Sequence, residues 1–597
     1  MRMKSHSLPL AILVIACGSS GAFGQAVNPG RVNVVTTPWS VNWLTHANDA
    51  AALTDLGASA WMQTRIGDAD AAARLTGLGI SPWIQSWIAD ANNAELAVTR
   101  QAGVYNVTHF GALGDGTTDD TAAIQAAIEK ATGGARRIYF PPGVYVLGTP
   151  VEINRTNVEL FGHRAILKPA DGTLDTLLDI MATGSSMQTH IHGLLFSGYP
   201  VAGSHTGALI RATDGSLIDS VIENCWFSGA NANKAAIHAR AFHSTIRNCV
   251  FEFGSVGYLS DSDVTTYTGS LIISDCTFYR QIGEAVRLSD PGGGNRHGSI
   301  LVNNCRLARQ ANAVGGAFYF QTVTQVVLSN IVLGWDAIGG SAVNADGLYA
   351  TDVNSLSLSN AQFIGDVNHA SSTYSRFNHG LRFAGDCNDV TLSNVRIANA
   401  RYGMRFDGVN NVRMNGCRFE GGYTDGILIY PAAGGSLQIA DSTIDAYRGY
   451  LIDARATATT ELIVTDSRLF DGSWNRGSAL QLLTLASSGR TRIARNLIGK
   501  TRSASDATTC INRAAAATDL RIEQNEYIGG MTAYGGTAGI AIEMPDAGGT
   551  LVNCATGSGS PSGAVTPDYI GQEYLDTVAT KWYKSTGLTD TDWVALN

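Results

Sequence analysis

The apolar and polar positions of this chain repeat from residue 221 to residue 528. In each copy, two alternating apolar residues are followed by a polar pair that often ends in Asn or Asp, and then by another apolar residue, as in Val-Ile-Glu-Asn-Cys-Trp-Phe ending at Phe227. Successive copies are on average about 27 residues apart. Such a unit is too short for a βαβ crossover, which needs about 30 residues or more. The pattern therefore predicts two or three short strands per copy and an all-β solenoid, a parallel β-helix.

Cysteines occupy the same position of this repeat in four consecutive copies and once more later. They are Cys225, Cys249, Cys276, Cys305 and Cys417. We expect them to be free, because an inward row of thiols packs as small apolar groups and their parallel side-chain directions disfavour bonding. The Asn and Asp residues just before them are expected to form a structural ladder, either inside the solenoid or along a turn. Cys510 and Cys554 lie outside this register and are the disulfide candidates.

A helix is predicted upstream of the repeat, and a strand after it. Its apolar face holds Ile124, Ala127, Ile128 and Ala131, and its N-terminal cap and first-turn acids are Thr118, Asp119 and Asp120. The segment Gly-Asp-Gly-Thr-Thr-Asp-Asp-Thr at 114–121 opens this helix and resembles the pectate-lyase-like superfamily of right-handed β-helices. That superfamily includes polygalacturonases, rhamnogalacturonases, some epimerases and phage tailspikes.

The resemblance implies a right-handed parallel β-helix whose N-terminal end is plugged by this helix, followed by a first strand from Arg137 to Val146. It says little about the reaction, and we interpret Asp119 and Asp120 as structural. The expected organisation is a signal peptide at 1–25, an N-terminal module or arm at 26–104, the β-helix at 105–530 and a small C-terminal β module at 531–597.

The first 25 residues indicate export, because Arg2 and Lys4 precede a short apolar run and a small-x-small cleavage site at 22–24. We expect a secreted, periplasmic or cell-surface protein without a membrane span, since no apolar run approaches 20 residues. Val-Ile-Ala-Cys at 14–17 also resembles a bacterial lipobox, which leaves a lipid anchor at Cys17 as an alternative.

Composition agrees with a solenoid. The chain has 67 glycines, 45% hydrophobic residues and 15% charged residues, against a usual charged fraction of about 25%. The apolar content excludes disorder, and the absence of a Gly-X-Y period excludes collagen. With 41 basic and 50 acidic residues, the net charge of −9 makes nucleic acid an improbable partner.

In each copy, one strand contains a small residue followed by an apolar-x-apolar pattern, and this pattern aligns the strands of successive copies. If the apolar residues point inward, the outward row is Arg211, His238, Arg287, Tyr319, Tyr349, Arg382 and Arg405. Guanidinium groups match carboxylates or sulfates, and tyrosine rings stack on sugars. The row therefore favours an extended anionic polysaccharide lying along the solenoid. The alternative is a solvated face whose arginines pair with local acids such as Asp407.

Ionisable residues begin the same strands, namely Glu284, Asp346, His379 and Asp425. Asn344-Ala-Asp346-Gly is similar to the Asn-Thr-Asp-Gly motif of polygalacturonases, whose Asp belongs to the acid/base apparatus. The Asp-Asp pair and the Arg-Ile-Lys of that family are absent. An inverting hydrolase needs two carboxyl groups about 6.5–9.5 Å apart, which Asp346 and Asp366 would have to supply.

The competing chemistry is β-elimination on a uronate, in which Arg neutralises the carboxylate and Tyr, His or Arg removes the C5 proton. We expect a polysaccharide lyase. The alternatives are a glycoside hydrolase and a non-catalytic adhesion fibre, for which a homotrimer is one arrangement. The candidate catalytic residues are Asp346, Tyr349, Asp366, His379 and Arg382. The candidate substrate-binding residues are Arg211, His238, Glu284, Arg287, Tyr319 and Arg405. The sequence indicates no metal cluster, nucleotide-binding loop or other cofactor site.

Overall fold

A computed structural model describes residues 103–596 with gaps. The gaps are 132–135, 172–173, 175, 182–187, 199–206, 230–234, 262–268, 290–296, 310–315, 336–344, 366–376, 423, 431–434, 448, 455–460, 472–479, 486–489, 502–506, 514–518, 529–531, 536–541, 546–550, 568–572, 577–578, 580 and 588. The expectations for the signal peptide, Cys17 and nearly all of the N-terminal module lie outside these residues, as does Asp366.

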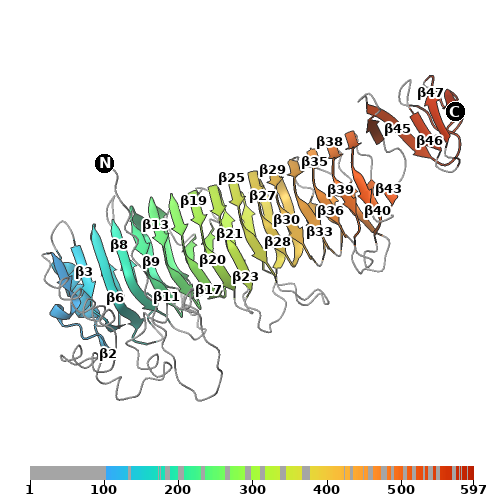
Figure 1. Cartoon of the computed structure of the whole chain (residues 1–597). Coiled ribbons are helices and arrows are strands. Elements are labelled where there is room, and N and C mark those ends of the chain that lie inside the picture. The colour runs from blue at the N-terminus through green and yellow to red at the C-terminus, as the bar shows by residue number, and fades with distance from the viewer. Residues whose placement is uncertain are drawn as a thin grey trace, which may run out of the picture. The chain divides into compact units, whose positions relative to one another are not determined.

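The described strands from β1 to β43 form one network of 43 strands, in which parallel strands pair from coil to coil (Figure 1). The first elements are β1 (Val104–Asn106), the 3-10 helix η1 (Val107–Phe110), β2 (Asp115–Asp119), α6 (Thr121–Lys130), β3 (Arg136–Phe140), β4 (Gly143–Leu147), β5 (Val151–Ile153), β6 (Val158–Pro169), β7 (Leu178–Ile180), β8 (Thr189–Ser197) and β9 (Ala208–Ile218). The next are β10 (Val221–Glu223), β11 (Trp226–Ser228), β12 (Ala235–Phe242), β13 (Ser244–Arg247), β14 (Val250–Glu252), β15 (Tyr258–Ser260), β16 (Leu271–Ser274) and β17 (Thr277–Gln281). The predicted parallel β-solenoid is confirmed.

The central coils continue this arrangement. They comprise β18 (Val286–Leu288), β19 (His297–Asn303), β20 (Arg306–Arg309), β21 (Phe318–Gln321), β22 (Val323–Ser329), β23 (Val332–Trp335), β24 (Leu348–Thr351), β25 (Ser355–Ser359), β26 (Gln362–Ile364), β27 (Phe377–Ser393), β28 (Arg396–Ala398), β29 (Ala400–Asn415), β30 (Arg418–Glu420) and β31 (Ile427–Tyr430). The solenoid strands end with β43 (Thr532–Gly535), slightly beyond the expected boundary at 530. Among the described residues, no helix is long and apolar enough to cross a membrane.

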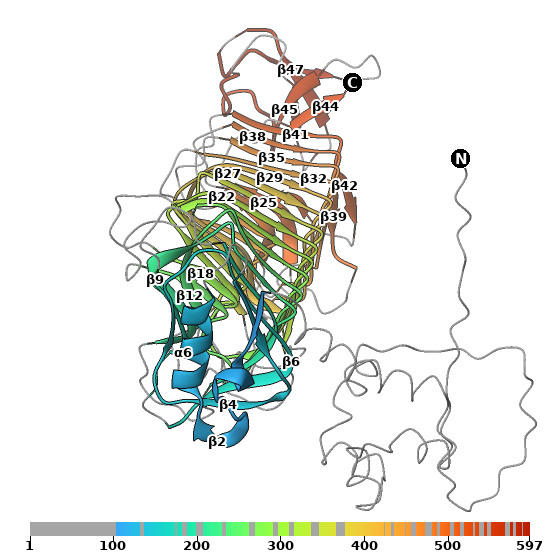
Figure 2. The ribbon, with the colours of Figure 1, turned by 90° about the vertical axis from the view of Figure 1, so that its left-hand side faces the viewer.

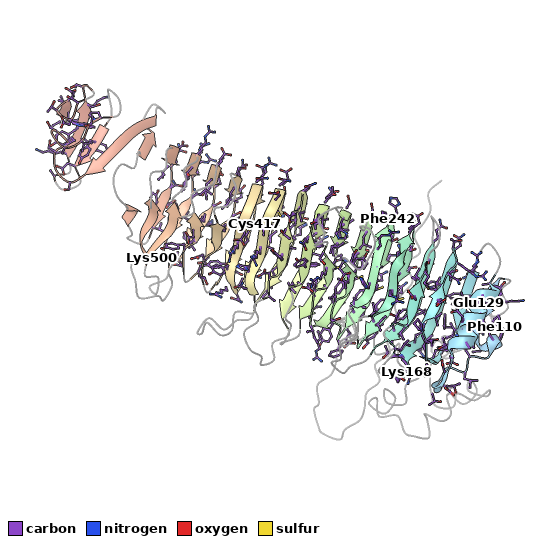
Figure 3. All side chains as sticks on the ribbon, turned by 180° about the vertical axis from the view of Figure 1, so that it is seen from behind. Phe110, Glu129, Lys168, Phe242, Cys417 and Lys500 are labelled. Carbon is purple, nitrogen blue, oxygen red and sulfur yellow. The ribbon has the colours of Figure 1, made fainter. Side chains whose placement is uncertain are left out.

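Inward side chains form continuous rows along the solenoid. Phe196, Phe227, Phe251 and Phe278 stack with ring centroids 5.1, 4.9 and 4.7 Å apart. The five predicted cysteines are buried and free, and so is Cys387; Cys417 is labelled in Figure 3. Burial raises the pKa of the Cys417 thiol to about 11, which keeps it protonated. These rows supply the apolar core that each coil obtains only by stacking on its neighbours.

The Asn and Asp residues before the cysteines turn the chain at the surface. Asn224, Asn248 and Asp275 have φ values of 53°, 52° and 56°, in the left-handed region that Asn and Asp adopt more readily than most residues. Further along, Asn394 Nδ2 donates to Asn360 Oδ1 at 3.2 Å. The expected ladder therefore lines an exposed turn and does not lie inside the core.

Helix α6 lies at the N-terminal end of the described coils (Figure 2). Ile124, Ala127 and Ile128 are fully buried, as the predicted apolar face requires. Its role as the plug of the solenoid stays a prediction. The N-cap residue is Asp120, which makes no side-chain cap hydrogen bond. Asp119 accepts the backbone N–H groups of Thr121 at 3.0 Å and Gly148 at 3.1 Å, so it links the first residue of the helix to the residue after β4.

Two other expectations for this region are corrected. Thr118 bonds to Asp115 in the preceding turn and takes no part in the cap. Asp120 accepts the backbone N–H of Leu113 at 2.6 Å, which supports a structural role. The single strand expected from Arg137 to Val146 is two strands, β3 and β4, separated at Pro141-Pro142, because proline has no N–H for a ladder hydrogen bond.

The C-terminal residues form a separate five-stranded sheet. Its strands are β44 (Ile542–Pro545), β45 (Leu551–Gly557), β46 (Glu573–Asp576), β47 (Lys581–Ser585) and β48 (Trp593–Leu596). Tyr574 and Trp593 are buried in it, with ring centroids 5.6 Å apart. The side chains of Cys510 and Cys554 are outside the described part of the structure, so their pairing stays a prediction.

Candidate active site

Five strands in the middle of the solenoid place one outward residue each in a common register. These residues, which we call the central ladder, are Arg287 on β18, Tyr319 on β21, Tyr349 on β24, Arg382 on β27 and Arg405 on β29. Their neighbours along each strand point inward: Phe318 and Phe320 are fully buried, whereas Tyr319 between them is half-buried. Strand alternation therefore separates the core from a surface of arginine and tyrosine, as the sequence predicts.

The side chains of the central ladder contact one another from coil to coil. The Arg287 guanidinium lies over the Tyr319 ring, 4.9 Å from its centroid, and the Arg382 guanidinium lies at the same distance over Tyr349. The two tyrosine rings meet edge to face, with centroids 5.2 Å apart. Each cation–π contact contributes about 0.5–2 kcal/mol, so the four side chains hold one another in place.

Acidic residues fix the arginines without occupying all their donors. Asp407 accepts from Arg382 Nε at 3.1 Å and from Arg405 Nε at 2.8 Å. Arg287 Nη1 lies 3.8 Å from Glu284 Oε1, and Arg382 Nη1 lies 3.9 Å from Asp346 Oδ2. Within the described part of the chain, the terminal nitrogens of Arg382 make no hydrogen bond. The pairing expected for a solvated face is thus present, yet guanidinium donors stay available for a ligand.

Asp346 and His379 form a hydrogen-bonded pair beside the central ladder. His379 donates to Asp346 Oδ1 from Nδ1 at 2.7 Å and from its backbone N–H at 3.3 Å. Because a carboxylate only accepts, Nδ1 carries the proton of this hydrogen bond. The His379 side chain is 1% exposed, and Nε2 is buried without a hydrogen-bond partner among the described residues.

Tyr402 packs against the Asp346–His379 pair, and the sequence did not predict it at the site. Its ring stacks on the His379 ring, with centroids 5.1 Å apart and planes 20° apart. The sequence signal was present, because Asp346, His379 and Tyr402 each precede a glycine at the start of the aligned strand. A Cβ built on Gly380 would lie 2.6 Å from the Gly403 carbonyl oxygen, so glycine permits the close approach of the coils there.

The outward row of residues predicted from Arg211 to Arg405 is shorter in the structure. Leu259 lies between His238 and Arg287 in the register, in a coil that the sequence alignment omitted. His238, expected to face a substrate, is buried and bonds to Asp261 at 2.9 Å. Arg211 is held by both oxygens of Asp179. These two residues are therefore separate from the central ladder. Glu284 is buried, and its carboxylate lies near Arg287.

The environment of Tyr319 keeps its hydroxyl protonated. Burial raises the pKa of Tyr319 above its ordinary value, and the neighbouring Tyr349, Glu284 and Asp352 act in the same direction, whereas Arg287 opposes them. Tyr319 is therefore suited to stacking and hydrogen-bond donation, and is a poor base at neutral pH.

Two segments of the chain match known protein families. Residues 104–178 match the rhamnogalacturonase A/epimerase, pectate lyase-like family, and residues 337–498 match the right handed beta helix region. The chain is therefore similar to the pectate-lyase-like family over residues 104–178 and to right-handed β-helices over residues 337–498. The resemblance inferred from the 114–121 motif is thus confirmed, and the second match includes most of the central ladder.

Relatives with assigned names match only parts of this β-helix protein. Alginate lyase 7 of Azotobacter vinelandii is 31% identical over 180 residues, which are 27% of this chain and 21% of that protein. Mannuronan C5-epimerase AlgE6 of the same organism is 37% identical over 100 residues, 15% of this chain and 11% of that protein. The chain therefore spans about a fifth or less of the length of these relatives.

Solved β-helix structures are similar to longer parts of this chain but at low identity. The A-module of Azotobacter vinelandii mannuronan C-5 epimerase AlgE4 has 16% identity and a TM-score of 0.32, covering 73% of this chain and 97% of that one. Tailspike protein 3 of bacteriophage CBA120 has 14% identity and a TM-score of 0.39, covering 85% of this chain and 70% of that one.

Proposed function

We propose that the central ladder binds an acidic polysaccharide and cleaves it by β-elimination at a uronate residue. The observation that carries this proposal is the Arg–Tyr–Tyr–Arg stack of Arg287, Tyr319, Tyr349 and Arg382. Its guanidinium groups match uronate carboxylates, and its rings offer faces and edges for sugar contacts. One such residue per coil suits an extended polymer better than a small, enclosed ligand.

In the proposed reaction, Arg382 pairs with the uronate carboxylate and stabilises the negative charge that develops when C5 loses its proton. Tyr349, in its phenolate form, takes this proton. The C5–H electron pair forms the C4=C5 double bond, and the C4–O bond breaks. The leaving oxygen keeps the bonding pair and takes the proton back from Tyr349.

Tyr349 is a better base than His379 because of where the two side chains lie. Tyr349 is half-buried on the outward face, with the guanidinium of Arg382, the proposed carboxylate partner, over its ring. His379 Nε2 is buried. Asp346 contacts both His379 and Arg382, so this pair is suited to positioning the arginine. The hydrolase alternative needs Asp366 as the second carboxyl group, and Asp366 lies outside the described residues.

The substrate class is part of the proposal. Relatives named alginate lyase and mannuronan C5-epimerase support a uronate polymer, with alginate as the first to test. We also propose that the protein acts outside the cytoplasm, because residues 1–25 have the features of a secretory signal.

The test compares two matched variants, Tyr349→Phe and Tyr319→Phe, on alginate and other uronate polymers. Elimination produces an unsaturated sugar that absorbs in the ultraviolet. We expect Tyr349→Phe to lower kcat by about 10²–10⁴-fold, the usual contribution of a general base. Tyr319→Phe should mainly raise KM, because it keeps the ring and loses only a donor. Equal losses in both variants would contradict Tyr349 as the base, and reducing ends without absorbance would replace elimination by hydrolysis.

A second candidate is C5 epimerisation, which begins with the same proton removal and returns a proton to the opposite face. The relatives named mannuronan C5-epimerase favour it. In D2O, epimerisation would incorporate deuterium at C5 and invert that carbon without absorbance or chain cleavage, which proton NMR measures. The absence of unsaturation, reducing ends and exchange on every polymer tested would leave a binding surface instead of an enzyme.

A further inference from the structure

Two histidines project from one face of β8, several coils before the central ladder. His190 and His192 are two residues apart, so strand alternation places both on the outward side. Glu159 on β6 lies opposite His190, and Glu223 on β10 lies opposite His192. The proposed elimination uses none of these four residues.

The four side chains converge diagonally across the three strands. His192 Nε2 lies 3.0 Å from Glu159 Oε1, and His190 Nε2 lies 2.9 Å from Glu223 Oε1. The imidazole centroids are 4.5 Å apart. One ligand atom each from Glu159, His190 and His192 lie within 4.8 Å of one another. The histidine side chains are 39% and 28% exposed, so an ion can reach them from solvent.

Neighbouring side chains hold this group in position. Arg137 Nε donates to Glu159 Oε2 at 2.6 Å, and Arg247 Nε donates to Glu223 Oε2 at 2.6 Å. Each carboxylate therefore presents its other oxygen, Oε1, to an imidazole. The His192 ring also stacks on Phe161, with centroids 5.4 Å apart and planes 14° apart. Such outer contacts orient ligands and are part of a built metal site.

We propose that Glu159, His190 and His192 bind one divalent transition-metal ion such as zinc. Two imidazole nitrogens and one carboxylate oxygen are a ligand set that suits zinc, copper or nickel, whereas calcium and magnesium take oxygen ligands. Metal–ligand distances are about 2.0–2.2 Å, so small side-chain rotations would bring the three atoms onto one ion. Three protein ligands leave a coordination position for water or a substrate oxygen. Glu223 is close enough to orient His190.

The competing explanation is a network of ion pairs that needs no metal. In that case each histidine acts only with its own carboxylate, as His243 does with Asp219, 3.6 Å away on the surface. A metal site requires His190 and His192 together on one ion. The two explanations therefore differ in what the loss of one imidazole does to metal binding.

The test is a zinc titration of the full chain, produced without a polyhistidine tag and stripped with a chelator, against a chromogenic competitor near neutral pH. We expect His190→Gln and His192→Gln each to weaken zinc binding at least about tenfold. The control His243→Gln removes a surface imidazole with a carboxylate partner and should leave the affinity unchanged. Excess calcium should not displace the zinc.

A second measurement counts the ligands directly. Electron paramagnetic resonance of bound Cu²⁺ should show two imidazole nitrogens in the wild type and one in either glutamine variant. Glutamine keeps a polar side chain on a partly exposed strand face, and the thermal midpoint without metal verifies folding. Zinc binding of equal strength in wild type and both variants, or no zinc binding by the wild type, would overturn the proposal. Neither measurement depends on catalytic activity.

Discussion

The central ladder and the His190–His192 cluster are two outward surfaces built on the same kind of backbone. In both, parallel strands about 4.8 Å apart present outward side chains in register from coil to coil. In the ladder, aromatic rings lie between guanidinium groups, and contacts run straight from coil to coil. In the cluster, imidazoles and carboxylates of three coils meet diagonally. The first arrangement extends along a polymer, whereas the second converges on a point.

This difference shows that the side chains stacked at a register position decide what a coil surface binds. The backbone supplies the spacing in both places. Rings and guanidinium groups are large enough to contact the residues directly opposite them. The Glu159 carboxylate instead reaches His192, which is two residues beyond its register partner His190. Because no contact joins the two surfaces among the residues that the structure describes, changes in one should be nearly independent of the other.

Among the changes that compare the two surfaces, Arg382→Ala should have the largest effect, because it removes the proposed carboxylate partner. We expect kcat/KM on a responsive uronate polymer to fall by about 10²–10³-fold, the usual cost of losing one donor to a developing anion. Arg382→Lys should recover only part of this, because lysine keeps the charge but lacks the planar fork. Zinc affinity at the cluster should stay unchanged in both variants. A change in zinc affinity would show that the two surfaces are coupled.

The next effect concerns His379 as a positioning residue. His379→Ala leaves Asp346 without its main partner, and should lower kcat by about 10–100-fold and the free energy of unfolding by about 1–3 kcal/mol. His379→Asn keeps an N–H donor near the Nδ1 position and should restore much of kcat. If Asn and Ala variants of equal stability have equal kcat, the hydrogen bond to Asp346 does not matter for the reaction.

A smaller effect is expected at Arg211, which tests where the ladder ends. Asp179 holds Arg211 through both carboxylate oxygens, and buried His238 and Leu259 separate it from Arg287. Arg211→Ala should therefore change kcat/KM on a long polymer by less than about threefold, within the range of a surface substitution. A loss comparable with that of Arg382→Ala would mean that the binding surface continues across the gap.

The smallest effect is a pH dependence at the N-terminal end. Hydrogen bonds from Thr121 lower the pKa of Asp119, an effect that burial partly opposes. Because the folded-state pKa lies below the unfolded one, this contribution to stability is present above the unfolded pKa of about 3.9 and is lost as the pH falls through the folded value. The thermal unfolding midpoint of Asp119→Asn should therefore fall less at acid pH than that of the wild type. Zinc binding should not change. An equal fall of the midpoint in both proteins would contradict this role of Asp119.

Much of the fold followed from residue periodicity. The repeated Asn-Cys positions predicted the buried thiols, and the apolar-x-apolar strands placed Tyr319, Tyr349 and Arg382 in one row, which the register confirms. Both signals are local, because each coil repeats the same inward and outward alternation. Leu259 was missed because an apolar residue at an outward position carries no polar signal. Tyr402 was missed because its significance lies in the ring it stacks on.

The sequence by itself determined the solenoid, the inward rows and the residue types on the outward face, since these depend on patterns within one coil. Tertiary structure alone decided which of those residues meet. His379 reaches Asp346 across 33 residues of chain, and His192 reaches Glu159 across the same number. Coil lengths vary with their turns, so sequence spacing does not fix the register between neighbouring coils. Only the backbone hydrogen bonds between stacked strands set that register, and with it the chemistry of each surface.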